Sequence, residues 1–174
     1  MRRVYLAAIG VAVLAMGGPA GASDDKPCPS GLVCASKPDT ITSIMKSLEP
    51  KVKMRKADDD DPVIDVEGPV YDYEVMFMDC KNRAQCAAVT FSSAFKAEPL
   101  LDVDFANRWN REHRIPKAYV DKDGALYLQL EVSTIGGLTR ANFRDWKEWW
   151  DSGLSDFAKF YDKESDARDP KKKV

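Results

Sequence analysis

The chain has 174 residues, with 26 basic and 28 acidic side chains, a single histidine and a net charge of −2. This modest acidity argues against a nucleic-acid or anionic-membrane partner, both of which select basic surfaces. The length suits one domain, large enough to bury a substantial core.

The N-terminus has the three-part layout of a secretory signal peptide. Arg2 and Arg3 precede an apolar run, and a stretch of small residues ends at Ala22. We predict that residues 1–22 are a signal peptide cleaved after Ala22, which makes the protein periplasmic or secreted. The alternative is a membrane anchor, but glycines and a proline interrupt the run before the roughly 20 apolar residues that span a bilayer. Cleavage would leave 24 basic and 28 acidic side chains, a net charge of −4, and no anchor.

The four cysteines, Cys28, Cys34, Cys80 and Cys86, all lie in the part of the chain that would be exported. Four cysteines allow three pairings, and the equal C-x5-C spacing favours two local bridges, Cys28 to Cys34 and Cys80 to Cys86. Zinc binding and thiol redox catalysis are the alternatives. The spacing is wider than is usual for zinc ligands, and no C-x-x-C motif is present. We therefore predict structural disulfides, with no metal and no cofactor.

The first half of the mature chain predicts a short helix and two hairpins. Residues 23–38 are rich in proline, serine and charge, and predict an extended lead-in closed by the first bridge. Asp39 or Thr40 should then cap a helix that ends near Leu48. Residues 51–57 and 63–68 alternate as paired strands around the acidic turn 58–62, which is typical of a solvated turn and not of a calcium loop.

Two alternating runs around the second cysteine pair predict the strongest hairpin. The first run places Asp72 and Glu74 on the face opposite its aromatic residues. The apolar face comprises Tyr71, Tyr73, Val75 and Phe77 in the first run and Val89, Phe91, Ser93 and Phe95 in the second. A bridge at the mouth of this hairpin would fix its register, since a slip by one residue would turn every aromatic side chain outward.

The second half of the mature chain predicts a helix, a hairpin and a long final helix. Asp102 or Asp104 begins a helix that carries Trp109 and His113 and ends before Pro116. Residues 117–120 and 125–132 form a hairpin around an Asp-Gly turn, with its leucines inward. Thr139 should cap a long final helix, and residues 162–174 should form a charged, disordered tail. An aromatic stripe on that helix should cover the sheet: Phe143, Trp146, Trp150, Leu154, Phe157 and Tyr161.

Three stretches in fixed order carry a resemblance to a known family: "YDYEVMFMDCKNRAQCAAVTF", "ANRWNREHRIPKAYVDKDGALYLQLEV" and "GGLTRANFRDWKEWWDSGLSDF". They resemble the exported, cysteine-containing members of the YbjN family, labelled bacterial sensory transduction regulators. The resemblance places the domain at residues 39–161. It implies an α+β fold, an antiparallel sheet flanked by helices and similar to type III secretion chaperones, often paired with a second copy. The family brings no established catalytic residues.

The resemblance favours a non-enzymatic exported module that binds a protein partner, chaperone-like or regulatory in envelope sensing. Trp149 and Phe160 lie off the main stripe of the last helix and are the candidate partner surface; burial against the first or second helix is the alternative. A homodimer is one form that the partner could take. A small-ligand-binding or structural envelope protein is the next alternative. A hydrolytic enzyme comes third, because His113 is the only imidazole.

Overall fold

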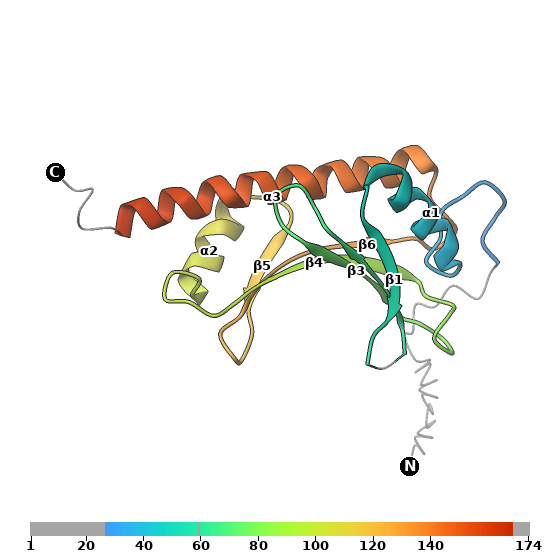
Figure 1. Cartoon of the computed structure of the whole chain (residues 1–174), viewed down its shortest axis with the longest axis horizontal. Helices are drawn as coiled ribbons and strands as arrows, with labels where there is room; N and C mark the ends of the chain where they lie inside the picture. The colour runs from blue at the N-terminus through green and yellow to red at the C-terminus, as the bar shows by residue number, and fades with distance from the viewer. Residues whose placement is uncertain (1–26, 59, 169–174) are drawn as a thin grey trace, which may run out of the picture.

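Six strands form one antiparallel sheet in the order β1-β2-β3-β4-β6-β5, and three helices pack on it (Figure 1). The computed structural model describes residues 27–58 and 60–168. The predicted signal peptide lies outside the described residues. The elements in chain order are α1 (Pro38–Leu48), β1 (Val52–Lys56), β2 (Pro62–Val66), β3 (Tyr73–Met78), β4 (Ala88–Phe95), α2 (Val103–Glu112), β5 (Lys117–Val120), β6 (Leu126–Ser133) and α3 (Arg140–Arg168).

The three helices lie on one side of the sheet. α3 runs along the sheet, with α1 near its beginning and α2 near its end, whereas the tips of the β1–β2 and β5–β6 hairpins point away from α3 (Figure 1). This arrangement confirms the predicted α+β class, with an open antiparallel sheet and a long C-terminal helix.

The core is built from rows of side chains that cross the strands. Ile64, Val75, Phe91 and Leu130 are aligned on four neighbouring strands, and all are buried. The ring of Phe91 lies 5.8 Å from that of Trp150 on α3. Burying each such side chain stabilises the fold by about 1.5–3 kcal/mol. The predicted inward faces of β3 and β6 are therefore confirmed.

Two of the predicted helix caps are confirmed, and one is wrong. The Asp102 carboxylate accepts a hydrogen bond from Phe105 N at 2.7 Å, which lowers the pKa of Asp102, and Thr139 Oγ1 accepts one from Asn142 N at 3.1 Å. α1, however, begins at Pro38, without a side-chain cap. Proline supplies a helical φ and has no N–H at the first position, so the start of α1 has one N–H group fewer to satisfy.

The predicted tail is shorter than expected, because α3 continues to Arg168. Arg108 of α2 pairs with Glu164 at 2.7 Å, and Arg168 donates a hydrogen bond to Pro99 O at 2.9 Å. These contacts tie the last turns of α3 to α2 and to the loop that precedes it. Residues 169–174 lie outside the described residues.

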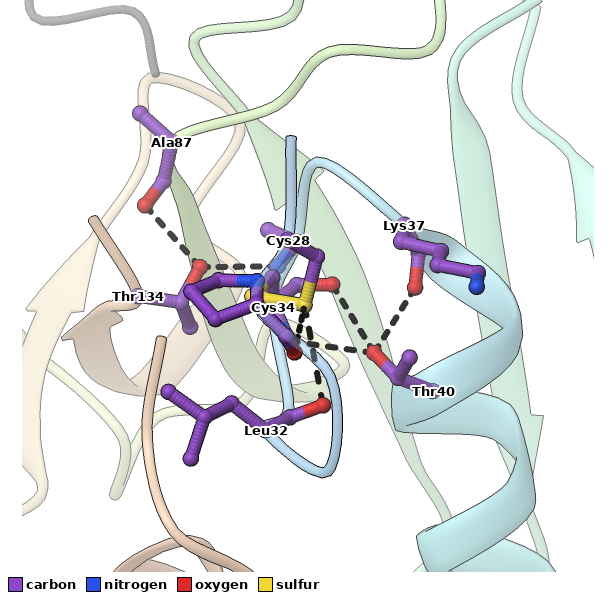
Figure 2. The surroundings of a disulfide bond; sticks show 9 residues. Cys28, Leu32, Cys34, Lys37, Thr40, Ala87 and Thr134 are labelled. Carbon is purple, nitrogen blue, oxygen red and sulfur yellow. Dashed lines mark hydrogen bonds between the residues drawn. A yellow bond between two sulfur atoms is a disulfide. The ribbon is translucent and has the colours of Figure 1, made fainter. Parts of the chain in front are cut away.

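The lead-in is part of the core and not a separate arm. Val33, Cys34 and Ala35 are buried, and Val33 pairs with Leu138 in an isolated bridge. Figure 2 shows how this segment is held. Thr134 Oγ1 accepts a hydrogen bond from Ala35 N at 2.8 Å and donates one to Ala87 O at 3.2 Å. The buried Thr134 thus joins the first bridged segment to the residue that follows Cys86.

Replacing Thr134 with valine should lower the free energy of unfolding by about 1–3 kcal/mol, because Ala35 N–H would stay buried without an acceptor. Urea unfolding followed by tryptophan fluorescence measures this loss. Thr134→Ser keeps the hydroxyl and is the matched control, with a smaller expected loss. Equal losses in the two variants would show that the methyl group, and not the hydrogen bonds, matters at this position.

Candidate functional site

The sheet face away from the helices carries a wide groove of about 1060 Å³, which we call the sheet groove. Side chains alternate between the two faces of a strand, so the residues next to each core row point into this groove. Each of the six strands contributes to its lining: Lys53, Asp65, Glu74, Ser92, Tyr127 and Tyr119, in the order of the sheet.

One half of the sheet groove is charged. Lys53, Asp65, Glu74 and Ser92 are aligned across β1 to β4. Arg55 lies beside this row, donates a hydrogen bond to Asp65 Oδ1 at 2.8 Å and pairs with Glu74. Its guanidinium therefore screens the repulsion between two carboxylates that the sheet places side by side. The pairs are partly exposed, so they contribute little to stability and leave the surface polar.

The other half of the sheet groove is aromatic. Tyr119 of β5 and Tyr127 of β6 are directly opposite in register, and their rings stack at 5.1 Å with an angle of 9° between the planes. Tyr119 is 44% exposed. Partial burial, followed by the neighbouring Tyr127 and Asp121, raises the pKa of Tyr119, so this ring stays neutral at physiological pH. A flat pair of rings with one exposed and one half-buried member can stack on a ligand or accept a cation on its face.

The two residues of the predicted partner surface, Trp149 and Phe160, differ in exposure. Phe160 is 5% exposed and packs against Phe105 and Trp109 of α2, so it cannot contact a partner. This is the burial against the second helix that the sequence left open. Trp149 is 38% exposed, with the Arg114 guanidinium 4.8 Å from its ring centroid and Trp146 at its edge. Only Trp149 of the two therefore belongs to a surface.

His113 has a packing role in this structure. Its ring stacks on that of Trp109 at 3.6 Å, and its Nδ1 lies 3.2 Å from Trp109 O. Within residues 27–58 and 60–168, no group of three or more His, Cys, Asp or Glu side chains is arranged to hold a metal ion.

The four cysteines form the two predicted local bridges, Cys28 to Cys34 and Cys80 to Cys86. Such bridges persist in an oxidising compartment, so they point to one. None of the helices in the described part of the chain combines the length and apolar character needed to cross a membrane.

The sequence predicted the hairpins of the sheet but not the sheet groove. The alternation that placed Asp72 and Glu74 opposite the aromatic residues was the available signal, and both residues do line the groove. What the alternation could not supply was strand order. The sheet places β6 next to β4 and β5 beyond β6, and so brings the tyrosine pair onto the same face as the acidic row.

The fold and groove define an α+β domain in which helices cover one face of the sheet, and no described helix covers the other. The YbjN family, described as "Putative bacterial sensory transduction regulator", matches residues 37–162, and the chain belongs to this family. No curated protein matches the chain. Residues 27–36, which include the first disulfide, precede the match, and Val33, Cys34 and Ala35 within them are nevertheless buried in the domain.

Proposed function

We propose that the protein is a non-enzymatic, exported module that binds a partner protein, with a chaperone-like or regulatory role in envelope sensing. The observation that carries this proposal is the sheet groove, whose lining comes from all six strands on the face that no described helix covers. A groove of this width suits a polypeptide segment better than a compact substrate. The family description, a regulator of sensory transduction, is consistent with such a role.

Export to the periplasm is part of this proposal. It rests on the predicted signal peptide in residues 1–22 and on the two disulfides, which a reducing cytosol would not maintain. The packing of His113 against Trp109 supports a non-enzymatic role, because the only imidazole in the sequence is held in a stacking contact.

Photo-crosslinking in intact cells tests the proposal. A photoreactive residue is placed at Tyr119 in the sheet groove and, in a second variant, at Trp149 on α3. We expect Tyr119 to form a crosslink to a discrete protein, identified by mass spectrometry. A crosslink to a second copy of this chain would identify a homodimer through the open face. Capture from Trp149 would instead assign the partner surface to α3.

The matched control is a photoreactive residue at Lys159, whose side chain is 77% exposed on α3, away from both surfaces. Discrete products from Tyr119 or Trp149 that are absent from Lys159 support the proposal. If neither position yields a product, and native mass spectrometry finds a small molecule retained by the protein, the alternative of a small-ligand-binding protein replaces it.

A further inference from the structure

The charges around the sheet groove are unequal. Its lining contains five carboxylates, those of Asp65, Glu67, Asp72, Glu74 and Asp121, and two lysines. Arg55 adds a third cation through its pairs with Asp65 and Glu74. Lys51 pairs with Glu67, so three of the five carboxylates already form an ion pair.

The two remaining carboxylates flank the tyrosine pair. Asp72 precedes β3, next to β4, and Asp121 follows β5, two residues after Tyr119. Among the described residues neither forms a salt bridge, although the Lys51 ammonium, which is paired with Glu67, interacts electrostatically with Asp72. Asp121 Oδ1 accepts hydrogen bonds from Asp123 N and Ala125 N, which orients this carboxylate at the start of the β5–β6 turn. Ala94 of β4 lies opposite Tyr127 of β6, and its small side chain leaves space beside the tyrosine rings.

This end of the sheet groove has the chemistry of a cation site. A guanidinium or ammonium group over a tyrosine face is attracted by the ring, and a carboxylate within reach adds a charge-assisted hydrogen bond. Arginine suits both contacts, because its planar guanidinium can stack on a tyrosine ring and at the same time donate two hydrogen bonds to a carboxylate. An anionic segment would meet a net negative surface at the same place.

Resting on the proposed protein-binding function, we infer that the sheet groove binds an extended basic segment of the partner protein, with an arginine or lysine over Tyr119 and Tyr127 between Asp72 and Asp121. Six strands about 4.8 Å apart give a groove about 24 Å wide, which accommodates an extended segment of about seven or eight residues. The charged half then pairs with polar side chains further along that segment.

Fluorescence anisotropy with two labelled peptides of about nine residues tests this inference. In one peptide arginine alternates with serine, and in the other glutamate replaces every arginine. We expect the exported protein to bind the arginine peptide at least about tenfold more tightly. Asp72→Asn with Asp121→Asn should weaken that binding about tenfold, and Tyr119→Ala should weaken it by a similar factor. The asparagine at position 121 keeps an oxygen to accept the two turn hydrogen bonds.

The matched control removes two carboxylates from the opposite side of the domain, by Asp145→Asn with Glu148→Gln on the exposed face of α3. This variant carries the same charge change and should bind like the unmodified protein. Equal binding of the two peptides, no binding of either, or equal weakening by the control pair would overturn the inference. So would spermidine binding as tightly as the arginine peptide, because the groove would then take a free polyamine.

Failure of the inferred basic-segment binding can be distinguished from failure of the proposed protein-binding function. If crosslinking from Tyr119 captures a discrete protein while the peptides bind equally, the module binds a partner but not through basic side chains. If the arginine preference holds and no protein is captured at Tyr119 or Trp149, the proposed function fails and the cation site remains.

Discussion

Replacing Lys147 with methionine should lower the free energy of unfolding by about 3–5 kcal/mol at pH 7. Lys147 lies on α3, is 3% exposed, and is surrounded by acidic groups. Its ammonium donates hydrogen bonds to Asp151 Oδ1 and Oδ2 at 2.7 and 2.6 Å and pairs with Glu49 at the end of α1. Methionine fills a similar volume but leaves the buried Glu49 carboxylate without a cation, which is the costly way to break a buried pair.

The surroundings of Lys147 make the lost charge difficult to replace. The ring of Tyr73 lies 5.8 Å from the ammonium, and burial, together with Glu49 and Asp151, raises the pKa of the Tyr73 hydroxyl. Tyr73 is therefore neutral and cannot act as a charged partner. Lys147 is the residue that joins the end of α1 to α3, so its removal should also loosen α1.

The loss should depend on pH. Burial raises the pKa of Asp151 above its ordinary value of 3.8, although the hydrogen bonds and charge of Lys147 oppose this shift. An acid with a raised folded-state pKa binds its proton more tightly in the folded state, so the free energy of unfolding falls as pH rises through the shifted range. Without Lys147 the pKa of Asp151 should rise further. The difference between Lys147→Met and the unmodified protein should thus shrink as pH falls from 7 to 5.

Urea unfolding at both pH values measures these effects, and Lys159→Met is the matched control. Lys159 is on the same helix but 77% exposed and paired with the exposed Asp156, so its replacement should change stability by less than about 0.5 kcal/mol. Glu49→Gln combined with Lys147→Met should recover part of the loss, because no unpaired carboxylate then stays at the end of α1. A loss below about 1 kcal/mol for Lys147→Met would contradict a structural role for the buried cation.

The buried face of α3 shows what the sequence could not predict. Helical spacing correctly selected Phe143, Trp150 and Phe157, but it preferred Trp146 to its neighbour Lys147 and Tyr161 to Phe160. Either member of each pair fits a helical spacing of three or four residues. Tryptophan is also more hydrophobic than lysine, so the sequence favours burial of Trp146. Burial of Lys147 depends on Glu49, which is 98 residues away in sequence. A local pattern contains no information on such a partner.

The strands and their disulfides were more predictable than the groove that they create. Alternation and turn residues are local, so the hairpins followed from the chain itself, and the equal cysteine spacing favoured the observed pairing. The sheet groove depends on the order in which hairpins assemble, which places β6 between β4 and β5. The packing of residues 33–35 likewise depends on Thr134, from the other end of the domain. Long-range pairing decided both of these features, whereas the missed start of α1 at Pro38 has a local cause.

Replacing Gly153 with alanine should destabilise the protein by about 1–3 kcal/mol, against the expectation from helix propensity. Alanine in a helix interior is more favourable than glycine by about 1 kcal/mol, so the sequence alone predicts a gain. In the structure, however, a Cβ at position 153 would lie 2.1 Å from Pro116 Cδ and 3.3 Å from Pro116 N. These are ring and backbone atoms of the α2–β5 connection, and they cannot rotate away as a flexible side chain could.

The position of Pro116 is fixed from its other side as well. Trp109 Nε1 donates a hydrogen bond to Pro116 O at 2.9 Å, and Trp109 is fully buried. Moving the proline to admit a methyl group would break this bond or separate α2 from α3. Thermal and urea unfolding of Gly153→Ala measure the cost, with Ser152→Ala as the matched control on the exposed face of the same helix. The control should gain a few tenths of a kcal/mol from propensity. A gain of the same size for Gly153→Ala would mean that α3 and the α2–β5 connection are not in close contact.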